Sequence, residues 1–452
     1  MTVTSDPFAT DGAAFFGGGG ITLSLEYVIP IFLAMVFAAA LLSSRTKIPH
    51  TMILLGFGIS ISVLGAGGFL SVVNFGQFKI DPKLVITFII PPLIFEAMMR
   101  VDYKQFKAVR VSALLLATAG VVLATLIGGF LLVYLASLPF LVAFAFAALI
   151  SPTDAAIVIE IFKRVKVPRL LSNLMEAEAA FNDATGAIAF SSIIAIAIGS
   201  SGYSIPGIST SYLNTSGVVP TLLSNNPIHL SLLTQAEHFI ILFLGGSAIG
   251  LAIAAATHRL HTLMNDPLSE TSLTIVTVFG SVVLANSLGV SGLAAVAVAG
   301  LYFGNVTVKK EATMSKSVRT FAFNFWEMTA FFASSAAFLY LGINMNLANI
   351  VQHFHMIALS LVAVFGARAA TTYPLLAATT RFAKENIPNT WKHIVLLGGM
   401  RGAISVALVA SIPTSDFKNI LQTMTFGVVL LSLIIQYVVL SRYVRRVFPE
   451  VQ

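Results

Sequence analysis

Long runs of apolar residues, separated by short polar stretches, fill most of this 452-residue chain. The approximate bounds of these runs are 21–43, 49–64, 84–99, 111–136, 140–162, 170–198, 228–257, 268–288, 290–303, 321–345, 350–378, 391–412 and 417–440. A membrane-spanning helix needs about 20 mostly apolar residues, whereas a spanning strand would show about ten residues of alternating polarity. The pattern therefore predicts an all-α polytopic membrane protein with about 13 transmembrane helices.

Composition supports this prediction and excludes several classes of protein. Hydrophobic residues make up 57% of the chain, charged residues only 10%, and the mean hydropathy is +0.91. A soluble domain usually has about 25% charged residues, because its surface needs polar cover. A soluble enzyme, a disordered chain and a coiled coil are therefore excluded. The chain has no cysteine, so it forms no disulfide and no thiolate metal site.

The basic residues indicate which way the chain threads the membrane. The net charge of +7 would suggest nucleic acid in a soluble protein, but here it reports topology. With the N-terminus outside, 21 of the 26 Lys and Arg residues fall in inside loops, and only Lys79, Lys83 and Lys418 fall in outside loops. This split predicts a cell-membrane protein with an extracellular tail at 1–20 and a short cytoplasmic tail at 441–452. No Lys or Arg precedes Arg45, so we expect no secretory signal. Because the positive charge reports topology, we expect no nucleic-acid partner.

Asp183 is the most conspicuous ionisable residue inside a predicted span, because it lies near the middle of segment 170–198. A charge near the bilayer centre is costly and usually lines a cavity or binds a partner. Asn182 precedes it, and small residues surround both, which leaves room for water or an ion. We predict that Asp183 binds an ion. The alternative is a protonated carboxyl that is hydrogen-bonded to a neighbouring helix.

Two predicted spans carry interruptions at matching places. In the fifth, Pro152 removes a backbone hydrogen bond and is followed by Asp154; in the twelfth, glycines flank Arg401 in residues 398–402. If spans 1–6 and 8–13 are inverted repeats joined by the seventh, these interruptions correspond. Such paired breaks indicate a transporter's central site. We expect crossed, interrupted helices 5 and 12, with Asp154 facing Arg401 and freed carbonyls available to a cation. A plain proline kink and glycines that merely allow close packing are the alternatives.

Further charged residues within the spans suggest ion pairs. Glu178 and Asn182 lie four residues apart and share a helix face. Arg368 lies inside the eleventh span, where a buried arginine needs a partner, and Glu178 is the nearest plausible one. Glu96 precedes Arg100 by four residues, a spacing at which ion pairs are routine.

Motifs of several enzyme classes are absent or too weak to support a function. Residues 289–292 read G-V-S-G, as in intramembrane serine proteases. Such an enzyme needs a histidine base, but the available histidines, His353 and His355, lie near the outer end of the eleventh predicted span. No Gly-Asp dipeptide supports an intramembrane aspartyl protease, and no P-loop supports ATP-driven transport. The eight histidines show no metal-ligand spacing. We therefore expect no enzyme and no cofactor.

Five short stretches, in order along nearly the whole chain, together carry a family resemblance. Residues 176–183, with Glu176, Glu178, Asn182 and Asp183, match the pattern E-x-E-S-x-x-N-D except that Ala179 replaces its serine. Thr153-Asp154 matches the start of a T-D-P segment, with Ala155 in place of the proline. Residues 91–96, 325–327 and 398–403 match three more segments. Together they resemble the sodium/proton exchangers and their NhaP-type prokaryotic relatives.

The resemblance implies a homodimer in which an elevator-like core moves. It implies that Asp183 alternately binds a proton and a monovalent cation, and that Thr153 and Glu96 assist at the ion. It further implies that Asn182 and Asp154 organise the site and that Glu178 pairs with Arg368; Arg401 is expected to support the site.

The resemblance also gives the expected domain organisation and function. Within a transmembrane antiporter domain at 21–440, the core is expected at about 111–198 and 350–440, the dimerisation domain at about 21–99 and 268–345, and a linker helix at about 228–257. We expect exchange of sodium or lithium for protons, electroneutral because one carboxylate, Asp183, changes partners. Potassium/proton exchange and a cation channel remain the alternatives.

Overall fold

The computed structural model describes residues 25–46, 48–66, 85–162, 164–199, 232–264, 266–308, 314–383, 385, 387–412 and 416–448. Within these ranges the regular elements are helices, and no β-strand occurs. The predicted tail at 1–20 lies outside the described residues, as does the end of the predicted tail at 441–452.

Each of the predicted apolar segments corresponds to one helix or to a run of consecutive helices, which confirms the all-α membrane fold with about 13 spans. The first half of the chain contains α1 (Leu25–Thr46), α2 (His50–Ala66), η2 (Val85–Ile89), α4 (Ile90–Arg100), α5 (Tyr103–Phe106), α6 (Arg110–Leu115), η3 (Leu116–Gly120), α7 (Val121–Ala136), α8 (Phe140–Ile150), α9 (Ala156–Phe162) and α10 (Arg169–Gly199).

The second half contains α12 (Leu232–His261), α13 (Pro267–Ser287), α14 (Gly292–Tyr302), η5 (Phe303–Thr307), α15 (Lys316–Ile343), α16 (Leu347–Gln352), α17 (Phe354–Ala378), η6 (Thr379–Ala383), α18 (Asn389–Leu397), α19 (Ala403–Ala410) and α20 (Asp416–Val447). Two boundaries differ from expectation. Helix α20 continues to Val447 and so includes much of the predicted tail at 441–452, and Lys418, expected in a loop, lies in its first turn.

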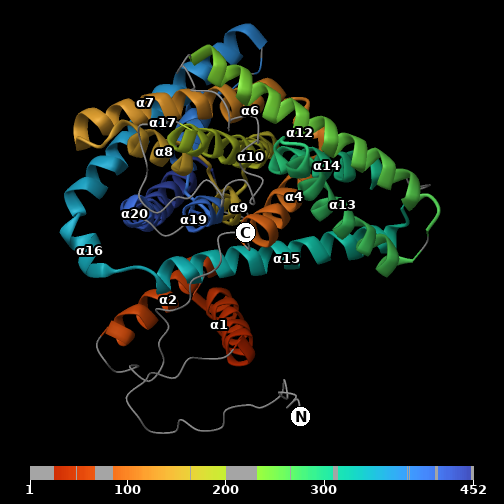
Figure 1. Cartoon of the computed structure of the whole chain (residues 1–452), viewed down its shortest axis with the longest axis horizontal. Helices are drawn as coiled ribbons and strands as arrows, with labels where there is room; N and C mark the ends of the chain where they lie inside the picture. The colour runs from red at the N-terminus through yellow and green to blue at the C-terminus, as the bar shows by residue number, and fades with distance from the viewer. Residues whose placement is uncertain are drawn as a thin grey trace, which may run out of the picture.

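The helices gather in two groups (Figure 1). On one side α7 contacts α8 and α17, α17 contacts α20, and α10 packs on α8; on the other α12, α13 and α14 pack together, with α4 against α14. The long helix α15 runs along both groups and contacts α2, α4, α13 and α19. Helices α10 and α4 therefore lie where the two groups meet.

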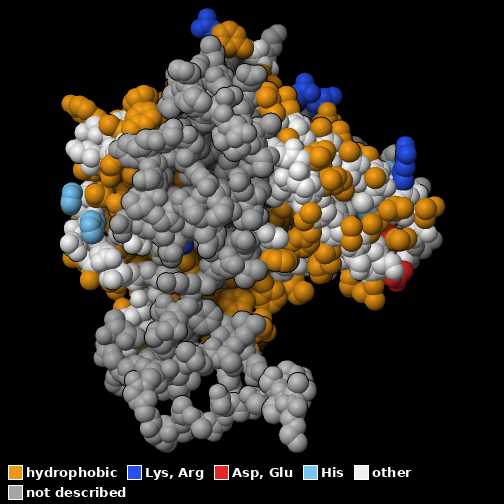
Figure 2. Space-filling model, viewed as in Figure 1, with side chains coloured by type: hydrophobic (Ala, Val, Ile, Leu, Met, Phe, Trp, Pro, Cys, Tyr) orange, Lys and Arg blue, Asp and Glu red, His pale blue; other side chains and the backbone are white. Residues whose placement is uncertain are grey.

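The surface is that of a protein surrounded by lipid. Large hydrophobic side chains are exposed along several helices; Phe37 is 72% exposed and Phe130 is 60% exposed. On the face drawn in Figure 2, hydrophobic side chains cover much of the described surface, and charged side chains lie mostly at its margin. Within the described part of the chain, six helices are long and apolar enough to cross a membrane without interruption.

Candidate functional site

The first helix interruption separates α8 from α9. Helix α8 ends at Ile150, and residues 151–155 are not helical because Pro152 has no backbone N–H. The carbonyl oxygens of Ser151 and Pro152 both accept hydrogen bonds from Nη1 of Arg401, at 3.0 and 3.3 Å. The expectation that these carbonyls are available to a cation is therefore wrong in this conformation, because a guanidinium from the other repeat occupies them.

The second interruption separates α18 from α19 and crosses the first. The carbonyl oxygen of Met400 accepts a hydrogen bond from the backbone N of Asp154 at 2.7 Å. Gly402, the N-cap of α19, lies against the Asp154 side chain so closely that a Cβ on it would be 2.6 Å from Oδ2. Only glycine allows this approach. The two broken helices are thus joined through backbone and side chain alike.

Asp154 and Arg401 each lie at the end of a half-helix from the other repeat. A helix carries partial positive charge at its N-terminus and partial negative charge at its C-terminus. The Asp154 carboxylate lies beside the first residues of α19, and the Arg401 guanidinium binds the carbonyls that follow α8. Each charge therefore compensates the opposing half-helix.

Helix α10 packs directly on the first interruption. Oδ1 of Asn182 accepts from the backbone N of Thr153 at 3.1 Å, and Nδ2 donates to Oγ1 of Thr153 at 2.6 Å and to Oε1 of Glu178 at 2.8 Å. One turn further, a Cβ on Gly186 would lie 2.5 Å from Cγ of Pro152. The buried Asn182 therefore holds Thr153 and α10 together, and both N–H groups of its amide are used in these hydrogen bonds.

A buried ion pair links α10 to α17, as the sequence predicted. Nη1 of Arg368 donates to Oε1 of Glu178 at 2.9 Å, and Nη2 donates to Oε2 at 3.2 Å. Glu178 is 0% exposed and Arg368 is 8% exposed. Nη2 also donates to the carbonyl oxygen of Val395 in α18, at 3.3 Å. This bidentate pair thus fixes α10 relative to the helix that precedes the second interruption.

Asp183 differs from the groups around it because its carboxylate has no partner among the residues that the structure describes. It is half-buried, one residue after Asn182, and no hydrogen bond or ion pair to its carboxylate occurs within the described residues. Asp154 and Glu178 are close enough for their charges to act on it. The neighbouring polar side chains are largely engaged with one another, which leaves Asp183 as a carboxylate able to bind something else.

Glu96 is held by a basic residue of its own helix. Its Oε1 pairs with Nε of Arg100, and Nη2 of Arg100 pairs with Oε2 of Glu327 at 3.1 Å, which joins α4 to α15. The structure therefore shows the ordinary pair that the spacing of Glu96 and Arg100 indicates. The assistance of Glu96 at the ion, implied by the resemblance, stays a prediction.

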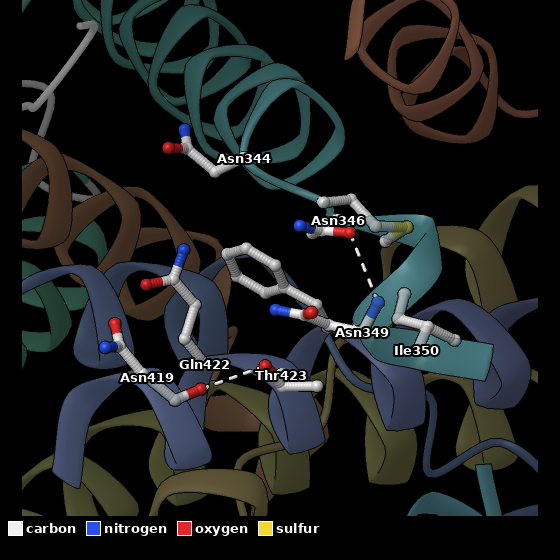
Figure 3. Close-up of a pocket in the computed structure, with 9 residues that line it drawn as sticks. Asn344, Asn346, Asn349, Ile350, Asn419, Gln422 and Thr423 are labelled. Atoms are coloured by element: carbon white, nitrogen blue, oxygen red, sulfur yellow. Dashed lines mark hydrogen bonds between the residues drawn. The ribbon is translucent and has the colours of Figure 1, made fainter. Parts of the chain in front are cut away.

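Among the cavities lined by described residues, two border helices α10 and α20. One of about 130 Å³ adjoins α10 two turns before Asp183, and its lining includes Arg100, Asp102, Asn173 and Glu176. The other, of about 300 Å³, lies between α20 and the α15–α16 junction, and none of the described residues that line it is charged. Figure 3 shows the amide groups of Asn344, Asn419 and Gln422 around it.

Sequence reasoning missed two buried residues of α20 that contact the second broken helix. Nε2 of Gln436 donates to the carbonyl oxygen of Gly399 at 3.2 Å, and Nζ of Lys418 donates to the carbonyl oxygens of Ala410 and Ile412 at the C-terminal end of α19. The available signal was their spacing with Thr425 and Ser432, which places polar residues on one face of an apolar helix.

Comparison with known proteins identifies the family of this chain. The model of the family described as "Sodium/hydrogen exchanger, transmembrane" matches residues 31–446. The chain belongs to the sodium/hydrogen exchanger family. It is therefore a multi-pass membrane transporter and not an enzyme.

Characterised relatives and a solved structure resemble this exchanger over most of its length. The Na(+)/H(+) antiporter ApNhaP of Aphanothece halophytica is 28% identical over 410 residues, which are 90% of this chain and 71% of that protein. The low-affinity antiporter NhaS1 of Synechocystis is 27% identical, with 92% and 74% covered. The structure of MjNhaP1 from Methanocaldococcus jannaschii at pH 8 aligns with a TM-score of 0.71 at 20% identity, covering 93% of this chain and 98% of that one, and so shares the fold.

Proposed function

We propose that this exchanger moves sodium, or lithium, in one direction and protons in the other by alternating access at Asp183. The observation that carries the proposal is the unpaired, half-buried carboxylate of Asp183 on a helix packed against two crossed helix interruptions. A carboxylate can hold either a proton or a monovalent cation, and the competition between them couples the two fluxes. The names of the relatives ApNhaP and NhaS1 as Na(+)/H(+) antiporters support sodium as the cation.

The surrounding residues take supporting parts in this proposal. Thr153 and Glu96 would assist at the ion and Asn182 would organise the site, while Asp154 and Arg401 neutralise the half-helix ends. Glu178 and Arg368 form a permanent structural pair. Because these groups join α8, α10, α17 and α18, we infer that they move as one core, about 111–198 and 350–440. The helices at about 21–99 and 268–345 would form the dimerisation domain of a homodimer, with the linker at 228–257 between them.

Exchange is expected to be electroneutral, because a single carboxylate changes partners. Glu178 is neutralised by Arg368, and Asp154 lies beside a helix N-terminus, so neither needs to titrate during the cycle. An electrogenic step would respond to voltage by about 2.3 kcal/mol per charge per 100 mV. A potassium–valinomycin potential imposed on proteoliposomes should leave sodium-driven pH change unaltered. Acceleration by one sign of potential would instead require a second proton carrier.

Membrane orientation can be tested separately, since the chain has no cysteine. We propose that the N-terminus is outside and the C-terminus cytoplasmic. A single cysteine at the position of Arg442 should then react with a membrane-impermeant maleimide only after intact cells are opened. Labelling of intact cells would reverse the orientation.

The decisive experiment replaces the unpaired carboxylate. Asp183→Asn should abolish sodium-driven and lithium-driven proton exchange in proteoliposomes while the protein remains folded, because an amide neither exchanges a proton nor neutralises a cation. Glu160→Gln is the matched control; Glu160 pairs with Arg164 at 2.8 Å on α9, and its loss should leave exchange intact.

Three results would count against the proposal. Wild-type exchange by Asp183→Asn would remove Asp183 from the mechanism. Exchange of potassium alone would favour the potassium alternative, and cation flux that moves no protons in the opposite direction would indicate a channel.

A further inference from the structure

Helix α20 presents an unexpected row of buried polar side chains. Lys418, Thr425, Ser432 and Gln436 follow at intervals of seven, seven and four residues, which places them on one helix face. Their exposed fractions are 7%, 0%, 1% and 2%. A buried polar group is costly unless it is hydrogen-bonded, so this row needs a structural explanation. The two outermost members provide one.

Lys418 binds the C-terminal end of α19. Its Nζ donates to the carbonyl oxygen of Ala410 at 3.1 Å and to that of Ile412 at 2.6 Å. The last carbonyls of a helix have no partner within the helix, and a cation there also opposes the negative end of the helix dipole. Lys418 therefore caps α19 with both hydrogen bonds and charge.

Gln436 binds the interruption that precedes α19. Its Nε2 donates to the carbonyl oxygen of Gly399, and its Oε1 is buried without a hydrogen-bond partner in the described part of the chain. Gly399 is also in contact with Arg368, since a Cβ there would lie 2.8 Å from Nε. The interruption is therefore held by two different helices, α17 and α20.

The adjoining face of α20 has another neighbour. Asn419, Gln422 and Thr423 border the cavity of about 300 Å³ against the α15–α16 junction, and Lys418 is not among its lining residues (Figure 3). The residues that border the cavity and the row from Lys418 to Gln436 thus lie on separate faces of one helix. Only the second contacts α19 and the interruption before it through the hydrogen bonds described above.

We propose that Lys418 and Gln436 are positioning residues for the cation site, because through them α20 holds both ends of α19 in place. Helix α19 has only eight residues, follows a glycine-rich interruption and cannot fix its own direction. Held at both ends by α20, it keeps Gly402 against Asp154 and keeps Arg401 on the carbonyls of the first interruption. The inference rests on the proposed function, because it concerns the affinity of the site for sodium.

The test separates positioning from simple stability. Lys418→Met and Gln436→Leu remove the donors while keeping side-chain bulk; Lys316→Met and Gln352→Leu are matched controls at exposed positions. In proteoliposomes we expect the apparent KM for sodium to rise about tenfold in each test variant, as is typical when outer-shell support of an ion site is lost. The maximal rate should change by less than about twofold, and Lys418→Arg should restore most of the affinity.

Sodium binding to the purified protein gives an independent readout. Sodium should raise the unfolding temperature of both test variants less than that of the wild type at equal concentration, because weaker binding stabilises less. Lower unfolding temperatures with unchanged KM and unchanged sodium response would show a purely structural role and overturn the proposal. Asp183→Asn in the same assay reports on the proposed function itself. If Asp183→Asn loses exchange and the sodium response while both α20 variants keep the wild-type KM and sodium response, the positioning proposal alone fails.

Discussion

The two helix interruptions have similar positions in their repeats but opposite chemistry. At residues 151–155 a proline ends the helix by removing a hydrogen-bond donor, and the carbonyls left without a helical partner accept hydrogen bonds from the Arg401 side chain. At residues 398–402 glycines remove side chains, so that Asp154 approaches Gly402 and donates its backbone N–H to Met400. The first interruption therefore depends on a charge supplied by the second, whereas the second depends on close approach.

This difference implies an asymmetry of effect. Substitutions in the second interruption remove both the charge and the space on which the crossing depends. Substitutions of the proline leave the tertiary hydrogen bonds of the first interruption in place. We therefore expect the second interruption to be the more sensitive of the two.

The largest effect is expected for Arg401→Met. This change removes the charge at the crossing and leaves two buried carbonyls without their donor, each at a cost of about 1–3 kcal/mol. Exchange should fall at least ~100-fold, which corresponds to about 2.7 kcal/mol of lost stabilisation. Arg401→Lys should keep part of the activity, since its ammonium group can still donate. Sodium-driven pH recovery in proteoliposomes measures both, and wild-type exchange by Arg401→Met would refute the dependence of the first interruption on the second.

A large effect on stability is expected for Arg368→Met, which strands Glu178 in the core. Breaking one partner of a buried pair costs about 3–5 kcal/mol. Adding Glu178→Gln should recover part of this loss, because no charge is then left unpaired. The midpoint of thermal unfolding, measured for both single variants and the double variant, gives the coupling. Strictly additive effects would mean that the pair does not join α10 to the helix before the second interruption.

An intermediate effect is expected for Gly402→Ala. The new Cβ would lie 2.4 Å from Cβ of Asp154, which is too close for the crossing to remain unchanged. We expect about a tenfold loss of exchange, or roughly 1.4 kcal/mol. Gly280→Ala is the matched control, because nothing lies within 4 Å of a Cβ there, and it should exchange normally. Equal activity of both variants would show that close approach at the second interruption is dispensable.

The smallest effect is expected for Pro152→Ala. Alanine allows a helix at this position, but Arg401 and Asn182 still bind the backbone of residues 151–153. We therefore expect less than about a threefold change in rate, equivalent to roughly 0.7 kcal/mol. A loss as large as that of Gly402→Ala would show that the proline itself, and not the tertiary hydrogen bonds, maintains the first interruption.

Local sequence patterns predicted the parts of the site that arise from single residues. Pro152 and the glycines at 398–402 located both interruptions, and a lone arginine in an apolar span led to the Glu178–Arg368 pair. The carbonyls of Ser151 and Pro152 were wrongly expected to be free, because their donor lies about 250 residues away in the chain. Lys418 was assigned to a loop for a similar reason, because no sequence pattern shows that its ammonium group binds backbone carbonyls at the end of α19.

The sequence by itself determined the spans, the two interruptions and the choice of ionisable residues inside the membrane. These follow from length, hydropathy and the cost of a charge in lipid, which act on each segment separately. Only the tertiary structure decided which groups contact one another. Arg401 binds the carbonyls of the other repeat, Asp154 lies beside the start of α19, and Asn182 binds Thr153. Hydrogen bonds act over about 3 Å. Asp183 is therefore recognised as the unpaired carboxylate only once every competing partner has been placed in space.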